Sequence, residues 1–211
     1  MSDWFYNLVW YTFWPAFGVS SSPIVLHPER PRRPGAYLLA ANHLSPFDVP
    51  CLIKESGRKL DFVSITEVFT NPFMAWFYGN MNAFPLDRGR VDLGTTRTIL
   101  DRLRQGRAVG IFPEGGIRKE ENSVLSGGRI KPGVIRLAQL ANVPIIPAVL
   151  LGTSAYQRVL SWAPLRRVRY GINYGEPIEP NSGENVDALE AQLRAAYRSL
   201  HAELVAAMSS P

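Results

Sequence analysis

The stretch AYLLAANHLSPFD, residues 36–48, decides the fold. Its first six residues form a short apolar run, which is typical of a buried strand. Ser45 is a preferred residue at the start of a helix, a proline follows it, and Asp48 stands three positions later. The stretch therefore predicts a buried strand, then a turn that carries His43, and then a helix that begins at Ser45.

The rest of the chain repeats this change from strand to helix. Strands are predicted at residues 60–65, 81–86, 108–112, 143–151 and 167–174, and helices at residues 92–106, 132–141 and 186–204. The alternation predicts an α/β fold with a mostly parallel central sheet flanked by helices, whose active site lies at the carboxyl ends of the strands. We expect one domain over residues 36–211, preceded by a Ser- and Pro-rich linker, or a surface strand and loop, at residues 20–35.

Composition limits the class of protein. The chain has 211 residues, of which 46% are hydrophobic and 19% charged, and this excludes an intrinsically disordered chain. A single cysteine, Cys51, excludes a disulfide scaffold and a thiolate metal cluster. The three histidines, His27, His43 and His201, lie far apart in the sequence, so we expect no metal site.

The basic charge narrows the possible partners. The net charge is +5, and most of the 23 basic residues are arginines. Such a charge suits phosphorylated substrates, an anionic membrane or nucleic acid. Acidic residues are interspersed with the arginines and no helix-turn-helix, zinc or RNP pattern is present, so we expect no nucleic-acid partner. The sequence also has no P-loop and no G-x-G-x-x-G motif after a strand, so nothing supports a nucleotide cofactor.

Residues 4–17, WFYNLVWYTFWPAF, contain eight aromatic residues. A helix over them would be about 20–25 Å long, which is shorter than the hydrocarbon core of a bilayer, about 30 Å. Since Trp and Tyr favour the boundary between membrane and water, we expect residues 1–19 to form an interfacial helix. The alternative is a first helix packed on the protein's own core. The expected membrane anchor consists of Trp4, Phe5, Trp10, Phe13 and Trp14.

His43 and Asp48 form the first candidate site. In a continuous helix the two side chains would point about 140° apart, but a turn between them lets the carboxylate fold back onto the imidazole. A carboxylate on one ring nitrogen fixes the tautomer and raises the basicity of the other, which makes a general base. The alternative is structural, because Ser45-x-x-Asp48 is also a capping box.

Three further motifs could bind an anion. Arg88 follows a predicted strand and could form two hydrogen bonds to a phosphate. The turn Glu114-Gly115-Gly116 follows another strand, and its glycines let backbone N–H groups approach a ligand. Lys131 stands directly before a predicted helix, where free N–H groups attract anions. The plainer alternatives are a surface ion pair, an ordinary turn and a solvated lysine.

The order of four motifs resembles the glycerolipid acyltransferase family, whose best-known members are the 1-acylglycerol-3-phosphate acyltransferases. The resemblance covers about residues 36–150. It rests on Asn42-His43-x-x-x-x-Asp48, Phe84-x-x-x-Arg88, Phe112-Pro113-Glu114-Gly115 and Val143-Pro144-Ile145-Ile146-Pro147. It implies that His43 is the catalytic base, that Asp48 is its partner, and that the acceptor is held by Arg88, Glu114, Gly115, Arg118 and Lys131.

The third motif departs from the family at one place. The family continues Phe-Pro-Glu-Gly with Thr-Arg, whereas Gly116-Ile117-Arg118 follows here. The threonine hydroxyl is therefore missing and the arginine is displaced by one residue.

The resemblance implies direct transfer of a fatty acyl group from acyl-CoA or acyl-carrier protein to a hydroxyl of a lysophospholipid. The first expected acceptor is 1-acyl-sn-glycerol 3-phosphate, which would give phosphatidic acid; glycerol 3-phosphate and other lysolipids are alternatives. No cofactor is expected besides the acyl donor. The enzyme would lie as a monotopic protein on the cytoplasmic face of the membrane. The rival from another class is a non-catalytic module that binds a membrane surface.

Overall fold

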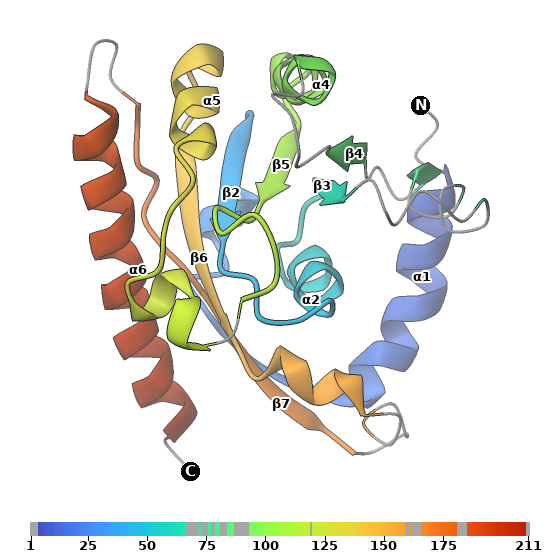
Figure 1. The fold of residues 1–211 in the computed structure, drawn as a ribbon. Coiled ribbons are helices and arrows are strands. Elements are labelled where there is room, and N and C mark those ends of the chain that lie inside the picture. Colours follow the sequence, from blue (N-terminus) through green and yellow to red (C-terminus); the bar gives the residue numbers. More distant parts are fainter. Residues whose placement is uncertain are drawn as a thin grey trace.

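The computed structural model describes residues 4–65, 72, 76, 79–80, 84–86, 93–118, 120–158, 161, 166–180 and 185–209. A seven-stranded sheet forms its centre, with the strand order β1-β7-β6-β2-β5-β3-β4 (Figure 1). Neighbouring strands run parallel except for the antiparallel pair β6–β7. The strands are β1 (Ser21–Leu26), β2 (Tyr37–Ala41), β3 (Leu60–Ile65), β4 (Phe84–Leu86), β5 (Ala108–Ile111), β6 (Ile145–Leu151) and β7 (Val168–Tyr174).

Helices cover both faces of this sheet. Side chains of α1 (Trp4–Val19) and α2 (Asp48–Glu55) pack on one face, and those of α4 (Leu93–Arg104), α5 (Gly133–Ala141) and α6 (Val186–Ser209) pack on the other. Short 3-10 helices occur at η1 (Arg30–Arg32), η3 (Glu120–Asn122), η4 (Val124–Ser126) and η5 (Thr153–Gln157). The predicted α/β class, a mostly parallel sheet flanked by helices, is confirmed.

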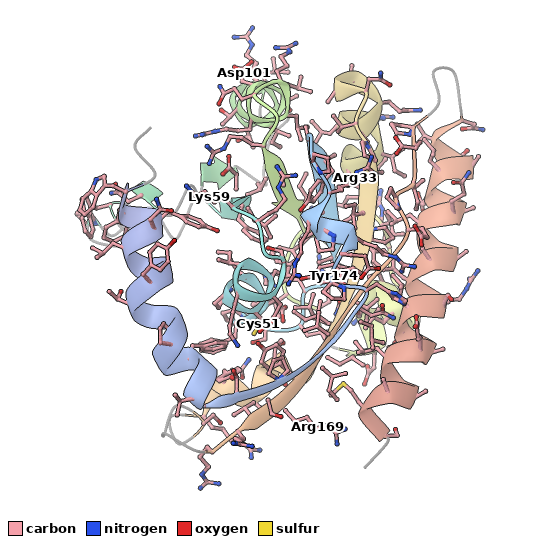
Figure 2. All side chains as sticks on the ribbon, turned by 180° about the vertical axis from the view of Figure 1, so that it is seen from behind. Arg33, Cys51, Lys59, Asp101, Arg169 and Tyr174 are labelled. Carbon is pink, nitrogen blue, oxygen red and sulfur yellow. The ribbon has the colours of Figure 1, made fainter. Side chains whose placement is uncertain are left out.

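The central strand β2 shows why the core has two halves. All five of its residues are buried, and successive side chains point to opposite faces of the sheet. Leu39 joins the core beneath α1 and α2, whereas Leu38 joins the core beneath α4, α5 and α6. Figure 2 shows the side chains on both faces of the sheet, with Cys51 and Tyr174 inside the molecule and Asp101 at its periphery.

One boundary differs from the sequence expectation, and in one segment the structure shows which of two alternatives is formed. Helix α2 begins at Asp48 rather than Ser45, because the Ser45 hydroxyl accepts a hydrogen bond from the Phe47 N–H and residues 45–47 form a turn. The segment 20–35 carries β1, which pairs along its whole length with β7 and forms one edge of the sheet. Of the strand expected at residues 81–86 the structure describes 84–86, as β4.

One side of α1 packs on the body of the protein. Phe5, Tyr6 and Phe17 are buried. The Tyr6 hydroxyl accepts a hydrogen bond from the Leu60 N–H at 3.4 Å, and the Phe17 ring stacks on Tyr156 with centroids 4.8 Å apart. Phe5, which the sequence suggested as an anchor residue, therefore belongs to the packed face instead.

The other side of α1 leaves large apolar side chains in contact with solvent. Trp4, Leu8, Tyr11 and Val19 are exposed, and Tyr11 keeps 77% of its surface. The side chains of Trp10, Phe13 and Trp14 lie outside the described part of the structure. None of the described helices combines the length and the hydropathy needed to cross a membrane.

Candidate active site

Three neighbouring strands end at the site. His43 follows β2, Glu114 follows β5 and Thr153 follows β6, and these strands are adjacent and parallel. The carboxyl ends of parallel strands meet at one edge of a sheet, where ligands bind in open α/β folds. The predicted location of the site thus coincides with the point where residues from distant parts of the chain converge.

The His43–Asp48 pair is formed. His43 Nδ1 lies 2.9 Å from Asp48 Oδ2, the Asp48 side chain is fully buried, and the His43 side chain is 12% exposed. An ionised carboxylate can only accept hydrogen bonds, so Nδ1 carries the proton and Nε2 keeps its lone pair. This arrangement orients the imidazole to take a proton through Nε2.

Asp48 also fixes the turn that precedes α2. The oxygen that contacts His43 accepts hydrogen bonds from the backbone N–H groups of Leu44 and Ser45, at 2.8 and 2.9 Å. The bond to Ser45 has the partners of a capping box, but α2 begins at Asp48 and its N-cap residue, Phe47, makes no side-chain cap bond. The carboxylate therefore holds this turn and supports His43, and it does not cap the helix.

The ring of Phe112 covers one face of the imidazole. The two centroids are 3.9 Å apart and the rings are inclined by only 8°. Stacking at this distance holds the plane of the His43 ring, which the bond to Asp48 alone would leave free to tilt.

Glu114 holds the loop of His43 from the other side. Its side chain is buried, with Oε2 accepting from the His43 N–H at 2.8 Å. Its Oε1 accepts from the Ser123 hydroxyl at 2.7 Å and from the Val124 N–H at 2.8 Å. The resemblance assigned Glu114 to the acceptor, but the structure shows a carboxylate whose described hydrogen bonds all go to the protein.

Gly115 and Lys131 fit together closely. Gly115 has a φ of +70°, and a Cβ atom at this position would collide with the Lys131 side chain. The Lys131 N–H also donates to the Pro113 carbonyl at 2.9 Å. The lysine side chain therefore crosses the turn that follows β5, and the positive φ of Gly115 is what favours glycine in this turn.

Arg118 remains next to the site despite its displacement in the motif. Its backbone N–H donates to the His43 carbonyl at 2.8 Å, and its guanidinium donates to the Glu114 carbonyl at 3.4 Å. Arg88 lies outside the described residues.

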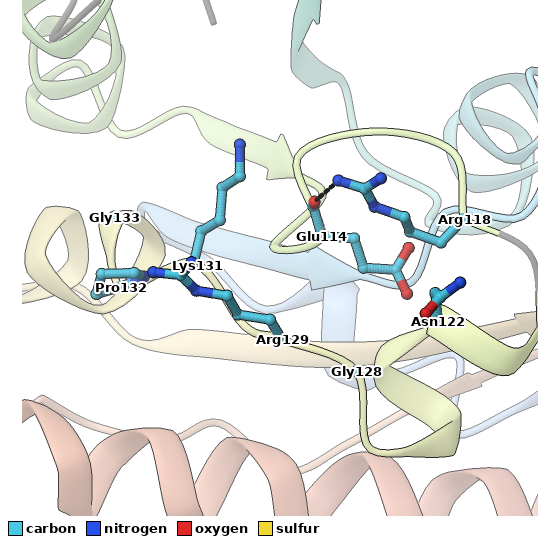
Figure 3. Close-up of a pocket in the computed structure, with 8 residues that line it drawn as sticks. All are labelled: Glu114, Arg118, Asn122, Gly128, Arg129, Lys131, Pro132 and Gly133. Carbon is cyan, nitrogen blue, oxygen red and sulfur yellow. Dashed lines mark hydrogen bonds between the residues drawn. The ribbon is translucent and has the colours of Figure 1, made fainter.

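A pocket of about 890 Å³ opens beside this loop (Figure 3). Three cationic side chains, Arg118, Arg129 and Lys131, line it together with the start of α5. The first N–H groups of a helix have no partner within the helix, and they favour an anion together with nearby cations. Because three cations face the single carboxylate that lines the pocket, Glu114, the pocket carries a net positive charge and is suited to a phosphate.

The sequence did not indicate the contacts of three residues near the site, Arg129, Asn42 and Thr153. Arg129 stands two positions before Lys131 in a segment that is neither helix nor strand, so no periodic pattern could place its side chain in the pocket. The Asn42 side chain bonds the Leu150 backbone in both directions, at 3.0 and 2.7 Å. The contact between Thr153 and Asp48 spans 105 residues, and no local pattern could have predicted it.

Two side chains close to His43 in the sequence could act as nucleophiles in a different mechanism. The Ser45 side chain is fully buried and its oxygen accepts from the Phe47 N–H at 3.1 Å. Burial raises the pKa of the Cys51 thiol, and the charges of Asp48 and Glu55 raise it further, so little thiolate forms. Neither group is activated for covalent catalysis.

Comparison with known proteins identifies relatives of this chain. Residues 23–151 match the acyltransferase family. The 1-acyl-sn-glycerol-3-phosphate acyltransferase of Bacillus subtilis is 25% identical over 143 residues, which are 67% of this chain and 66% of that protein. A 1-acyl-sn-glycerol-3-phosphate acyltransferase of Chlamydomonas reinhardtii is 31% identical over 179 residues, which are 83% of this chain and 51% of that protein.

The crystal structure of the 1-acyl-sn-glycerophosphate acyltransferase PlsC from Thermotoga maritima shares the fold, with a TM-score of 0.67 and 19% identity. The alignment covers 89% of this chain and 75% of that one. The chain thus spans about two thirds of the Bacillus relative and about half of the Chlamydomonas relative. Because the family match runs from β1 to the end of β6 and includes both the His43–Asp48 pair and the Glu114 turn, this chain belongs to the acyltransferase family.

Proposed function

We propose that the protein transfers a fatty acyl group from acyl-CoA or acyl-carrier protein to the free hydroxyl of 1-acyl-sn-glycerol 3-phosphate, giving phosphatidic acid. The observation that carries the proposal is the His43–Asp48 pair, in which Asp48 holds Nδ1 and leaves Nε2 as the proton acceptor. The backbone of His43 also contacts Glu114 and Arg118, which line the cationic pocket. The names of the relatives support the acceptor, since both proteins described above are named for this reaction.

The proposed reaction needs one base and no covalent intermediate on the enzyme. The acceptor hydroxyl loses its proton to His43 Nε2 while its oxygen bonds to the thioester carbonyl carbon. The tetrahedral intermediate then collapses with cleavage of the C–S bond, and the leaving thiolate takes the proton from Nε2. Asp48 stabilises the imidazolium between these two steps.

The loop after β5 supplies the surroundings of the reaction. The Gly115 N–H already donates to the Phe112 carbonyl at 2.9 Å, so it is not the donor that would stabilise the oxyanion. The acceptor phosphate is assigned to Arg118, Arg129 and Lys131 and to the first turn of α5, since these are the cations and helix N–H groups around the pocket.

The proposal includes contact with a membrane on its cytoplasmic face, where the acyl donors are found. Apolar surface on α1 is exposed at Trp4, Leu8, Tyr11 and Val19. Of these, Trp4 and Tyr11 belong to the residue types that favour the membrane interface. A monotopic attachment would bring the active site close to acceptors that reside in the bilayer.

Purified protein with radiolabelled acyl-CoA and a panel of acceptors tests the proposal directly. The panel contains 1-acyl-sn-glycerol 3-phosphate, glycerol 3-phosphate and an uncharged monoacylglycerol, and thin-layer chromatography separates the products. We expect labelled phosphatidic acid, and we expect a folded His43→Ala variant to form none. Label on glycerol 3-phosphate alone would change the acceptor, and absence of transfer to every acceptor would favour a non-catalytic membrane module.

A further inference from the structure

The carboxylate of Asp48 is held at both oxygens. Oδ2 accepts from His43 Nδ1 and from two backbone N–H groups, whereas Oδ1 accepts from the hydroxyl of Thr153. Both side chains are fully buried. Water therefore does not reach this contact, and the hydroxyl is the donor that the described residues supply to Oδ1.

Thr153 occupies a rigid position. It begins η5 directly after β6, where Gly152 turns the chain with a φ of +80°. A Cβ atom at Gly152 would lie 2.9 Å from the Arg169 carbonyl oxygen, so the turn is tightly packed against β7. The Thr153 hydroxyl is consequently presented by the end of a central strand rather than by a loose loop.

The end of β6 is also fixed to the end of β2. The Asn42 amide donates to the Leu150 carbonyl at 3.0 Å and accepts from the Leu150 N–H at 2.7 Å. Asn42 directly precedes His43, and Leu150 lies three residues before Thr153. The two-way contact sets the position of the hydroxyl relative to the loop that carries the base.

We propose that Thr153 is a positioning residue for catalysis, which acts on His43 through Asp48. The inference rests on the proposed function, because it concerns proton transfer by His43. An ionised carboxylate only accepts, so a hydroxyl at Oδ1 donates to it and prevents it from rotating away from the imidazole. A carboxylate held in this way keeps the proton on Nδ1 and the lone pair on Nε2.

A purely structural role for the hydroxyl is less consistent with its contacts. Gly152, not Thr153, is the residue that precedes the first turn of η5, and the hydrogen bond of the Thr153 side chain goes to Asp48. The hydroxyl thus contributes to the catalytic pair and not to the cap of its own helix.

Two substitutions separate the hydroxyl from the shape of the side chain. Thr153→Val keeps the shape and removes the donor, whereas Thr153→Ser keeps the donor. We expect Thr153→Val to lower kcat about tenfold with little change in the KM of the acceptor, because the carboxylate that orients His43 loses a hydrogen bond. Thr153→Ser should restore most of the rate. Thr98→Val is the matched control, because the Thr98 hydroxyl bonds a carbonyl within α4, away from the site.

A double-mutant cycle with Asp48→Asn identifies the route of the effect. If Thr153 acts through the carboxylate, Thr153→Val should lower kcat much less in the Asp48→Asn background than in the wild type. Equal losses in both backgrounds would overturn the proposal. So would a wild-type kcat in folded Thr153→Val, or in Thr153→Ala should the valine variant not fold.

The activity of the wild-type protein distinguishes a failure of the proposed function from a failure of the role of Thr153. If the wild type transfers no acyl group to any acceptor, the proposed function fails, and the role of Thr153 fails with it. If the wild type is active and Thr153→Val is equally active, only the role of Thr153 is wrong.

Discussion

Glu114→Gln tests whether this residue positions His43 or binds the acceptor. The carboxylate accepts from the His43 N–H at one oxygen and from Ser123 and Val124 at the other. A glutamine has one oxygen and one NH₂ group. Whichever way the amide turns, its NH₂ faces a backbone N–H, either that of His43 or that of Val124, and one donor remains without a partner.

The cost follows from these contacts. Loss of a hydrogen bond to a charged group costs about 1.5–3 kcal/mol, and a buried donor without a partner costs about 1–3 kcal/mol. We therefore expect the free energy of unfolding to fall by about 3 kcal/mol. In a chain of this size 1 kcal/mol corresponds to roughly 2–4 °C in Tm, so the Tm should fall by about 6–12 °C.

Calorimetry and steady-state kinetics together decide the question. If Glu114 holds the loop of His43, the Tm and kcat fall together, and the KM of the acceptor changes little. An unchanged Tm with a raised KM for the phosphorylated acceptor would refute this reasoning and make Glu114 an acceptor ligand. Ser123→Ala is a comparison variant, since it removes one donor to the same carboxylate together with the cap of η4 and leaves the His43 bond in place.

Three further changes test other parts of the structure. Arg129→Gln should raise the KM of a phosphorylated acceptor with little effect on the rate at which water hydrolyses acyl-CoA. Arg136→Gln, on the exposed side of α5, should change neither this KM nor the hydrolysis rate. The hydrogen bond from Asn173 lowers the pKa of Glu203 from 4.5, so this carboxyl stabilises the fold above pH 4.5 and loses the effect as the pH falls through its lowered pKa. Urea unfolding of Glu203→Gln should therefore show a deficit at neutral pH that disappears in acid; a deficit that persists in acid would contradict this. Tyr11→Glu places a charge on the exposed side of α1 and should weaken flotation with anionic vesicles, and unchanged flotation would exclude this side as the membrane contact.

The order of strands and helices follows from local signals. The apolar run before His43 and the helical periods after residues 92, 132 and 186 all correspond to elements of the structure. Periodicity predicts these elements because each of them buries one or both faces, and the spacing of the apolar residues indicates which face is buried. The start of α2 was predicted three residues too early, because Ser45 is as suitable for a turn as for a helix cap.

The candidate site was predicted only where its residues are close in sequence. His43 and Asp48 are five positions apart, and a single turn brings them together. The partners of Glu114 and Thr153 depend on which strands are adjacent in the sheet, and a single sequence does not contain that order. The packed side of α1 could not be predicted either, because a helix that is apolar all round does not reveal which side packs on the core.

The proposed direct transfer, without a covalent intermediate, depends on how His43 is supported. An enzyme that forms no bond to either substrate must hold its base at a fixed distance from both binding sites. Here His43 is held through Asp48 and through the Glu114 carboxylate. Glu114 belongs to the same turn as Gly115, over which the Lys131 side chain lies. The base and the cationic pocket are therefore connected through one short turn after β5. We therefore expect this turn, residues 114–116, to set the distance between Nε2 and the hydroxyl of an acceptor that is anchored by its phosphate.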